Sequence, residues 1–411
     1  MKIFNRKLKI TSSALLTLCM VFVMTACAEN SSQSEKSQPA EQTTVQPTTM
    51  SAEEINDRKL DKFISDMTLE EKVGQMFFVR CPDEDAVKQV SEYNIGGYIL
   101  FGRDFDGKTK DEVVDDIHSY QNEADIPLLI GVDEEGGTVV RISSNPNLRE
   151  TPFLSPKDTY ADGGWNAVKQ DAEEKADLLL SLGINVNLAP VCDMTSDEYG
   201  FMYDRSFSSD VDMENRYVRT VVETSKSKKL GTVLKHFPGY GNNSDTHTGI
   251  AYDDRDYSEF ENTDFKPFYQ GIESGADCIL VSHNIVNCMD SEYPASLSQK
   301  VHDILRNEFK FDGVIMTDDL IMDAITDFTG DEAAAVTAAK CGNDLLCCSS
   351  VDTQYPAVLE AVQNGEISKA QVDASVKRIL KWKQNLGIFN IDTYQKKVKS
   401  TEPTDTVGSE E

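Results

Sequence analysis

Eight short apolar runs, each followed by polar residues with helical spacing, limit what this chain can fold into more than any other feature of it. Strands that are apolar on both faces and alternate with helices form parallel sheets built of βαβ units. Eight such units in one chain predict an α/β fold, a closed (β/α)8 barrel of the TIM type in a single domain. The runs cover residues 74–81, 96–102, 127–133, 184–191, 231–237, 277–283, 313–319 and 344–348.

The segments between the runs contain helix signals. Thr68 and Glu71, in the stretch TLEEKVGQM, form a capping box that predicts the start of a helix. Residues 167–181 and 299–309 have helical periodicity as well. The chain has no obvious internal repeat, so the sequence does not predict a solenoid.

The N-terminus is predicted to be a targeting segment over residues 1–26. A basic start precedes an apolar run over residues 14–26, which is shorter than the ~20 residues of a membrane span. The run ends in MTAC, with a small residue directly before Cys27, and this pattern resembles the signal of a bacterial lipoprotein. We therefore expect Cys27 to be a lipidated N-terminus that anchors the protein outside the cytoplasm. An ordinary secretory signal with a chance cysteine is the alternative.

Polar segments flank the predicted barrel. Residues 28–51 contain no aromatic residue and one valine, so they cannot bury enough apolar surface to offset the entropy of ordering. We expect residues 27–51 to be a disordered tether and residues 393–411 to be a disordered tail. The barrel domain is therefore predicted to cover residues 52–392.

Charge and cysteine content exclude several classes of protein. The formal net charge is −30 at pH 7, which argues against binding nucleic acid or anionic lipid by charge. Seven cysteines follow Cys27, an odd number, and most lie in apolar runs. We expect them to be buried small hydrophobic residues rather than a disulfide framework. Their spacing does not fit a zinc site.

Ionisable residues collect at the ends of the predicted strands. In a (β/α)8 barrel, active sites form at the carboxyl ends of the strands. Several ionisable groups at one rim therefore predict an active site there. The strand ends carry Asp133-Glu134-Glu135, Cys192-Asp193, Lys235-His236, Ser282-His283 and Thr317-Asp318-Asp319.

Two kinds of chemistry fit these rim residues. Asp133, His236, His283 and Asp318 are the residue types of an amidohydrolase-like metal site, although the His-x-His pair usual after the first strand of such sites is missing. The alternative is a carboxylate nucleophile with a separate acid/base, which is how retaining glycosidases work.

Four motifs together resemble glycoside hydrolase family 3: KHFPGYG with a following DTH, FDGVIMTDDL, VDEEGG with a following Arg, and DRSF. The resemblance covers residues 55–390 in the right order and is strongest to the single-domain β-N-acetylglucosaminidase branch, whose bacterial members trim cell-wall sugars. It implies a retaining hydrolase that removes terminal, non-reducing β-linked N-acetylglucosamine through a glycosyl-aspartate intermediate. It implies no metal and no organic cofactor.

The resemblance also implies roles for individual residues. Asp318 matches the nucleophile, His247 the acid/base, and Asp245 the partner that orients this histidine. A histidine suits that role because its unperturbed pKa of ~6.5 lets it give and take a proton near neutral pH. The residues that match binders of the sugar are Asp133, Arg141, Arg205, Lys235 and His236.

Structural roles are the alternatives for some of these residues. Lys235 and His236 also fit a buried ion pair that closes the barrel, and Arg205 fits an ion pair with the neighbouring Asp204. The other histidines are expected to stand outside the chemistry, with His283 filling the barrel mouth and with His118 and His302 at the surface.

The chain departs from the family pattern in one loop. Where FPGHG is usual, Tyr240 replaces the histidine, and the loop to Asp245 is one residue shorter than is common. Three alternatives therefore stay open: a β-glycosidase of different sugar preference, a phosphorylase, and a non-catalytic sugar-binding lipoprotein. In each case the expected partners are a glycan and, through Cys27, a membrane. Nucleic acid is not an expected partner, and we expect a monomer.

Overall fold

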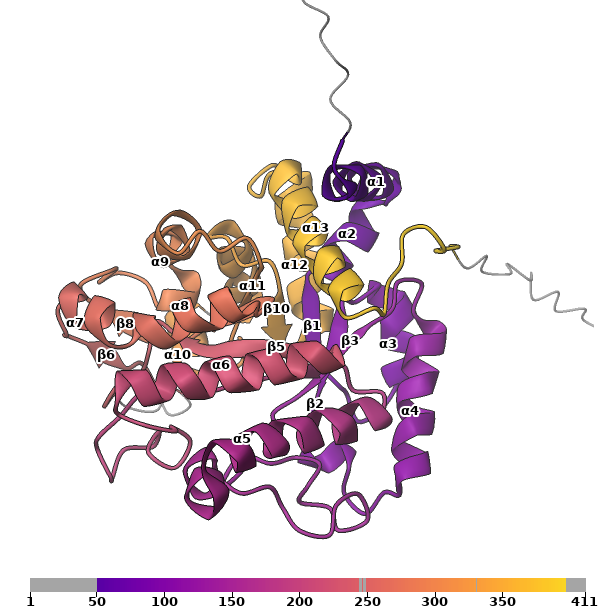
Figure 1. Ribbon diagram of the computed structural model, residues 1–411. Coiled ribbons are helices and arrows are strands. Elements are labelled where there is room, and N and C mark those ends of the chain that lie inside the picture. Colours follow the sequence, from indigo (N-terminus) through magenta and orange to yellow (C-terminus); the bar gives the residue numbers. More distant parts are fainter. Residues whose placement is uncertain (1–49, 244–245, 247–248, 330, 397–411) are drawn as a thin grey trace, which may run out of the picture. The chain divides into compact units, whose positions relative to one another are not determined.

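All eight predicted runs form strands of one parallel sheet (Figure 1). The computed structural model describes residues 50–243, 246, 249–329 and 331–396, with the backbone alone at 331–333. The strand order is β10-β1-β2-β3-β4-β5-β7-β9, and a parallel bridge between Met316 and Leu345 joins β9 to β10. The sheet thus closes on itself, which confirms the (β/α)8 barrel. The strands are β1 (Phe77–Arg80), β2 (Gly97–Leu100), β3 (Leu129–Val132), β4 (Val186–Asn187), β5 (Gly231–Phe237), β7 (Cys278–Val281), β9 (Val314–Thr317) and β10 (Leu346–Cys348).

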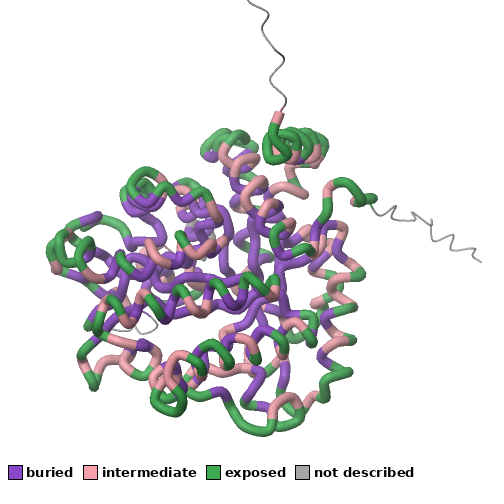
Figure 2. Tube along the Cα trace, viewed as in Figure 1, coloured by how far each residue is buried: buried purple, intermediate pink, exposed green. Residues whose placement is uncertain are grey.

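Helices surround the strands, and the strands are buried along most of their length (Figures 1 and 2). A separate parallel pair, β6 (Tyr252–Asp253) and β8 (Ile285–Val286), lies in the loops that follow β5 and β7. The helices are α1 (Ala52–Asp66), α2 (Leu69–Gln75), α3 (Ala86–Tyr93), α4 (Lys110–Glu123), α5 (Pro156–Ser181), α6 (Val211–Lys228), α7 (Tyr257–Asn262), α8 (Phe265–Ser274), α9 (Gln299–Asp303), α10 (Asp323–Thr329), α11 (Asp331–Lys340), α12 (Val351–Gln363) and α13 (Lys369–Asn385).

The predicted helix signals are confirmed with changed boundaries. Thr68 and Glu71 form the capping box that begins α2. Helix α5 contains the predicted residues 167–181 but begins earlier, before a break at two glycines, Gly163 and Gly164. The predicted helix over 299–309 is divided, because α9 ends at Asp303 and a π-helical turn follows it.

The burial expected for the cysteines is confirmed for all but one of those that follow Cys27. Among the described residues no disulfide is present, and six of the seven cysteines that follow Cys27 are buried. Cys288 is exposed, because it lies in the loop after β8 rather than in a barrel strand.

The expectation for His302 was wrong, whereas His118 is exposed as predicted. His302 is 1% exposed, and its Nδ1 lies 2.7 Å from the carbonyl oxygen of Ser298. It lies beside Gly342, in the turn that follows α11. Burial lowers the pKa of His302 below 6.5. A polar helical pattern in the sequence did not reveal this packing.

The segments outside the barrel stay predictions. Cys27, the predicted signal and nearly all of the predicted tether lie outside the described residues, as does most of the predicted tail. In the part of the chain that is described, no helix combines the length and the apolar character needed to cross a bilayer.

Candidate active site

A cavity of about 300 Å³ opens at the carboxyl ends of the barrel strands. That volume is at the small end of the ~300–1,000 Å³ typical of small-molecule sites. Six of the predicted site residues line it, and they come from the ends of β3, β5 and β9 and from the loops after β3 and β4. Asp245 and His247 lie outside the described residues. The six are Asp133, Arg141, Arg205, Lys235, His236 and Asp318.

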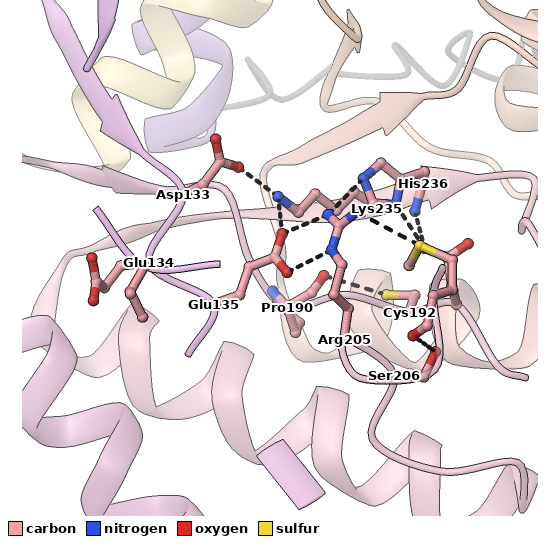
Figure 3. Close-up of polar contacts among 12 residues, drawn as sticks. Asp133, Glu134, Glu135, Pro190, Cys192, Arg205, Ser206, Lys235 and His236 are labelled. Carbon is pink, nitrogen blue, oxygen red and sulfur yellow. Dashed lines mark hydrogen bonds and ion pairs between the residues drawn. The ribbon is translucent and has the colours of Figure 1, made fainter. Parts of the chain in front are cut away.

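Lys235 is the centre of a buried charge network (Figure 3). Its Nζ lies 2.6 Å from Asp133 Oδ1 and 2.6 Å from Glu135 Oε1. Burial by itself lowers the pKa of Lys235, but the two carboxylates outweigh burial, and the pKa is raised above 10.5. Lys235 is therefore an ammonium that joins the end of β5 to the end of β3.

Glu135 links this lysine to Arg205. The guanidinium binds both carboxylate oxygens, with Nε 2.9 Å from Oε2 and Nη2 2.7 Å from Oε1. Burial raises the pKa of Glu135, yet Arg205 and Lys235 hold it well below its usual range. The turn depends on Gly136, whose φ is +103° and whose Cβ would lie 2.2 Å from the carbonyl oxygen of Leu154.

Glu134 points away from that network (Figure 3) and holds a different segment. Its Oε2 accepts hydrogen bonds from the backbone N–H of Arg141 at 2.9 Å and of Ile142 at 2.8 Å. Its Oε1 accepts from the hydroxyl of Ser143. Glu134 therefore positions the backbone that carries the Arg141 side chain to the cavity wall.

His236 is held by a carboxylate on one side and a guanidinium on the other. Nδ1 lies 2.7 Å from Asp193 Oδ2, and Nε2 lies 3.3 Å from Nη2 of Arg205. A guanidinium can only donate, so Nε2 is the acceptor and the ring proton is on Nδ1. Asp193 also accepts from the backbone N–H of His236 at 2.9 Å and of Tyr240 at 2.7 Å.

Tyr240, the residue that departs from the family pattern, is packed against this histidine. Its ring meets the imidazole edge to face, with centroids 5.3 Å apart. Its hydroxyl lies 2.5 Å from the hydroxyl of Thr246, which is buried and stands in sequence between Asp245 and His247. Burial raises the pKa of Tyr240 well above 10, so the phenol stays protonated. Tyr240 thus connects Asp193 and His236 to the loop that contains the predicted acid/base.

Asp318 and Asp319 follow β9 and have different surroundings. Asp318 Oδ1 accepts the backbone N–H of Asp319 at 2.9 Å. Asp319 accepts from the hydroxyl of Ser349 at 2.8 Å, and burial raises its pKa. His283, completely buried, lies 3.0 Å from the carbonyl oxygen of Asp319 and 2.7 Å from the hydroxyl of Ser296. This structural environment is the one expected for His283.

The ion pairs at the site also test the structural roles that the sequence left open for Lys235, His236 and Arg205. Lys235 and His236 do not pair with each other in the described structure, although Lys235 is buried and ion-paired. Arg205 pairs with Glu135 rather than with Asp204.

The two rim histidines are poorly placed to bind a metal ion. In His236 and in His283, both ring nitrogens already contact protein partners. Within residues 50–243, 246, 249–329 and 331–396, no group of three or more His, Cys, Asp and Glu side chains could hold a metal ion. The donor set of the predicted metal alternative is therefore already used within the protein.

The sequence analysis gave no role at the site to three residues that the structure places there. Glu135 and Asp193 stood in the predicted rim, but a strand end does not show which of its carboxylates will meet a cation. Arg80, at the end of β1, also lines the cavity. Its position at the end of an apolar run was the only signal for it.

The carboxyl end of the closed barrel thus holds a cavity lined by carboxylates, a lysine and arginines, which is where enzymes of this fold place their active sites. Residues 68–382 match the family model described as "Glycosyl hydrolase family 3 N terminal domain". The chain therefore belongs to glycoside hydrolase family 3 and is a glycosidase.

Relatives and solved structures agree with this placement. The chain is 32% identical over 273 residues to a β-hexosaminidase of Nitrosomonas eutropha, covering 64% of this chain and 77% of the relative. It is similar to a family 3 β-N-acetylglucosaminidase from Paenibacillus sp., with 29% identity and a TM-score of 0.74 over 84% of this chain and 66% of that one. A β-N-acetylhexosaminidase from Beutenbergia cavernae has 25% identity and a TM-score of 0.71 over 78% of this chain and 99% of that one.

Proposed function

We propose that this protein is a retaining β-N-acetylglucosaminidase that removes terminal, non-reducing β-linked N-acetylglucosamine from cell-wall fragments or chitooligosaccharides. One observation carries the proposal: Asp318 and the Lys235 network line the same small cavity at the carboxyl ends of the strands. A cavity of this size suits an enzyme that takes one terminal sugar. The names of the relatives, β-hexosaminidases and β-N-acetylglucosaminidases, support the choice of sugar.

In the first step, a carboxylate oxygen of Asp318 attacks the anomeric carbon while the glycosidic C–O bond breaks. His247 gives its proton to the leaving oxygen, with Asp245 orienting the imidazole. The hydrogen bond from the backbone N–H of Asp319 keeps the Asp318 carboxylate oriented. In the second step, neutral His247 takes a proton from water as the water oxygen attacks the anomeric carbon. The bond from the anomeric carbon to Asp318 breaks as the bond to the water oxygen forms, and the β configuration is retained.

The charge network grips the sugar. Arg205 and Lys235 hold the pKa of Glu135 low, so Glu135 stays ionised. The carboxyl oxygens of Asp133 can accept hydrogen bonds from sugar hydroxyls. An ammonium has three N–H donors, and in the described part of the chain Asp133 and Glu135 use two of them. The third is available to the substrate. Arg141, Arg205 and His236 complete the binding wall.

We infer the location of the enzyme from the sequence. Residues 1–26 are a lipoprotein signal, Cys27 is the lipidated residue, and residues 27–51 tether the barrel outside the cytoplasm. Globomycin-type inhibition of lipoprotein signal processing in cells, read as a mass shift of the protein, tests this assignment. A mature N-terminus other than Cys27, or a Cys27 without the mass of a lipid, would overturn it.

The activity is tested with an aryl β-N-acetylglucosaminide and the matching aryl β-glucoside, for the wild type and for Asp318→Asn. We expect the wild type to prefer the N-acetylglucosaminide and the variant to lose about four orders of magnitude in kcat/KM. NMR of the first product shows the mechanism: the β anomer supports retention, whereas the α anomer contradicts it. No cleavage of either sugar by the folded wild type contradicts the proposed function.

A further inference from the structure

Arg80 places a guanidinium at the wall of the cavity. It ends β1, lines the same cavity as Asp318, and its guanidinium carbon is 4.4 Å from the centre of the Phe101 ring. In the described structure its Nε is buried and has no hydrogen-bond partner. Among the residues that the structure describes, no carboxylate forms an ion pair with this arginine.

Three other arginines near this rim are ion-paired. Arg103 binds Asp83 at 2.7 Å, Arg205 binds Glu135 at 2.7 Å, and Arg255 binds two aspartates. Acidic residues outnumber basic ones by seventy to forty in this chain. Arg80 lines a cavity and has no ion-paired carboxylate among the described residues, although the chain is rich in acids. Its guanidinium is therefore placed to bind an anionic ligand.

A second guanidinium adds to the positive charge at this wall. The Arg141 guanidinium carbon lies 5.8 Å from the centre of the same Phe101 ring, and its Nε is also buried without a partner. Two cations beside one aromatic ring repel each other unless an anion lies nearby. Asp319 does not fully supply the negative charge that would balance these two arginines. Burial raises the pKa of Asp319, although the positive charge of Arg80 lowers it.

We propose that Arg80, with Arg141 beside it, binds an oxyanion next to the sugar, so that the preferred substrate or acceptor of this glycosidase is anionic. The inference rests on the proposed function. A guanidinium presents its N–H groups as a planar fork that matches a carboxylate or a phosphate. Two sources have this chemistry: a carboxylate on the aglycone, and free inorganic phosphate.

The two sources differ in what they do. A carboxylate on the aglycone is bound in the first step and leaves with the aglycone. Inorganic phosphate acts in the second step: one of its oxygens forms a bond to the anomeric carbon while the bond to Asp318 breaks. The product is then a glycosyl phosphate instead of the free sugar.

The test uses two aryl β-N-acetylglucosaminides, one with a carboxylate on the aryl ring and one with the neutral carboxamide, each with and without inorganic phosphate. The readout is the ratio of kcat/KM between the two glycosides and the yield of glycosyl phosphate. We expect Arg80→Gln to lower the preference for the anionic glycoside, or the phosphate-dependent rate, roughly tenfold or more. Arg80→Lys keeps the positive charge, so we expect it to retain part of the preference for the anionic glycoside or of the phosphate-dependent rate.

Arg103→Gln is the matched control, because this arginine lies at the same rim but is paired with Asp83. It should leave the ratio unchanged, and circular dichroism shows whether each variant is folded. The subsite is overturned if Arg80→Gln leaves the kcat/KM ratio unchanged. It is also overturned if the wild type neither prefers the anionic glycoside nor responds to phosphate. If neither glycoside is cleaved, the proposed function fails separately, and calorimetric titration of both glycosides decides the subsite: equal affinities overturn it.

Discussion

Two lysines, buried at opposite ends of the barrel, have opposite electrostatic environments. Lys235 is 2% exposed at the carboxyl end and contacts two carboxylates at 2.6 Å. Lys383 is 0% exposed at the amino end, and among the described residues its Nζ has one polar partner, the amide oxygen of Gln75 at 2.7 Å. The pKa of Lys235 is raised above 10.5, whereas burial lowers the pKa of Lys383 to about 7. Equal burial therefore does not decide the charge of a lysine; its partners do.

The cavities at the two ends differ in the same way. The carboxyl-end cavity is lined by the charged residues of the candidate site. A cavity of about 220 Å³ at the amino end has mainly apolar walls, among them Phe63, Met67, Ile95 and Tyr394. This agrees with the division of labour in barrels of this type, in which the amino end stabilises the fold and the carboxyl end performs the chemistry.

Replacing each lysine by the same apolar residue sharpens this comparison, and the largest effect is expected at the carboxyl end. Lys235→Met leaves the buried Glu135 and the partly exposed Asp133 with one cation fewer. Breaking a buried ion pair costs about 3–5 kcal/mol in the free energy of unfolding. We also expect kcat/KM to fall by roughly 10²–10³-fold, since charge stabilisation at the sugar is lost. Urea unfolding and the aryl glycoside assay measure both. A variant as stable and as active as the wild type would falsify the assigned network.

Lys383→Met is expected to act on stability alone, and in a pH-dependent way. The pKa of Lys383 is about 7 in the folded protein and ~10.4 in the unfolded chain, so between these values the unfolded chain binds more protons. The free energy of unfolding of the wild type therefore gains a contribution, on the order of 2–4 kcal/mol, as pH rises through this window. Below pH 7 that contribution is absent.

The variant lacks this titration, so it gains stability relative to the wild type at pH 6 and loses the gain by pH 10. Urea unfolding at several pH values measures the difference, with activity as the control. An equal effect of Lys383→Met at both pH values contradicts the buried, depressed amine. A loss of kcat/KM in the folded variant contradicts the separation of the two ends.

The smallest effect is expected from removing one hydrogen bond at the carboxyl end, between Tyr240 and Thr246. Tyr240→Phe removes the hydroxyl that meets Thr246 at 2.5 Å but keeps the ring against His236. One hydrogen bond contributes about 0.5–1.5 kcal/mol, so we expect kcat to fall a few-fold if the contact helps to hold the loop with His247. Phe201 packs on the same tyrosine and offers Phe201→Leu as an apolar control. A decrease of equal size in both variants means that packing, not the hydroxyl, is responsible.

Much of the fold was readable in the sequence because its signals are local. Each barrel strand is a short apolar run, and the Thr68–Glu71 capping box needs only neighbours along the chain. The rim was predictable for a related reason: parallel strands place their carboxyl ends on one side, so ionisable residues after each run must meet there. His302 shows the limit, since it is buried beside Gly342, in a turn that is distant from it in sequence.

The sequence by itself determined the barrel, the rim and the family resemblance, because periodicity and motif spacing are properties of short stretches of chain. Only the tertiary structure decided how the rim charges pair. Lys235 and Asp133 are 102 residues apart, and Glu135 rather than Asp204 binds Arg205. Barrel closure sets which strand ends face each other. Ion pairs form only where that geometry brings opposite charges within about 3 Å. It therefore decides which rim charges are neutralised and which, like that of Arg80, have no ion-paired partner among the described residues.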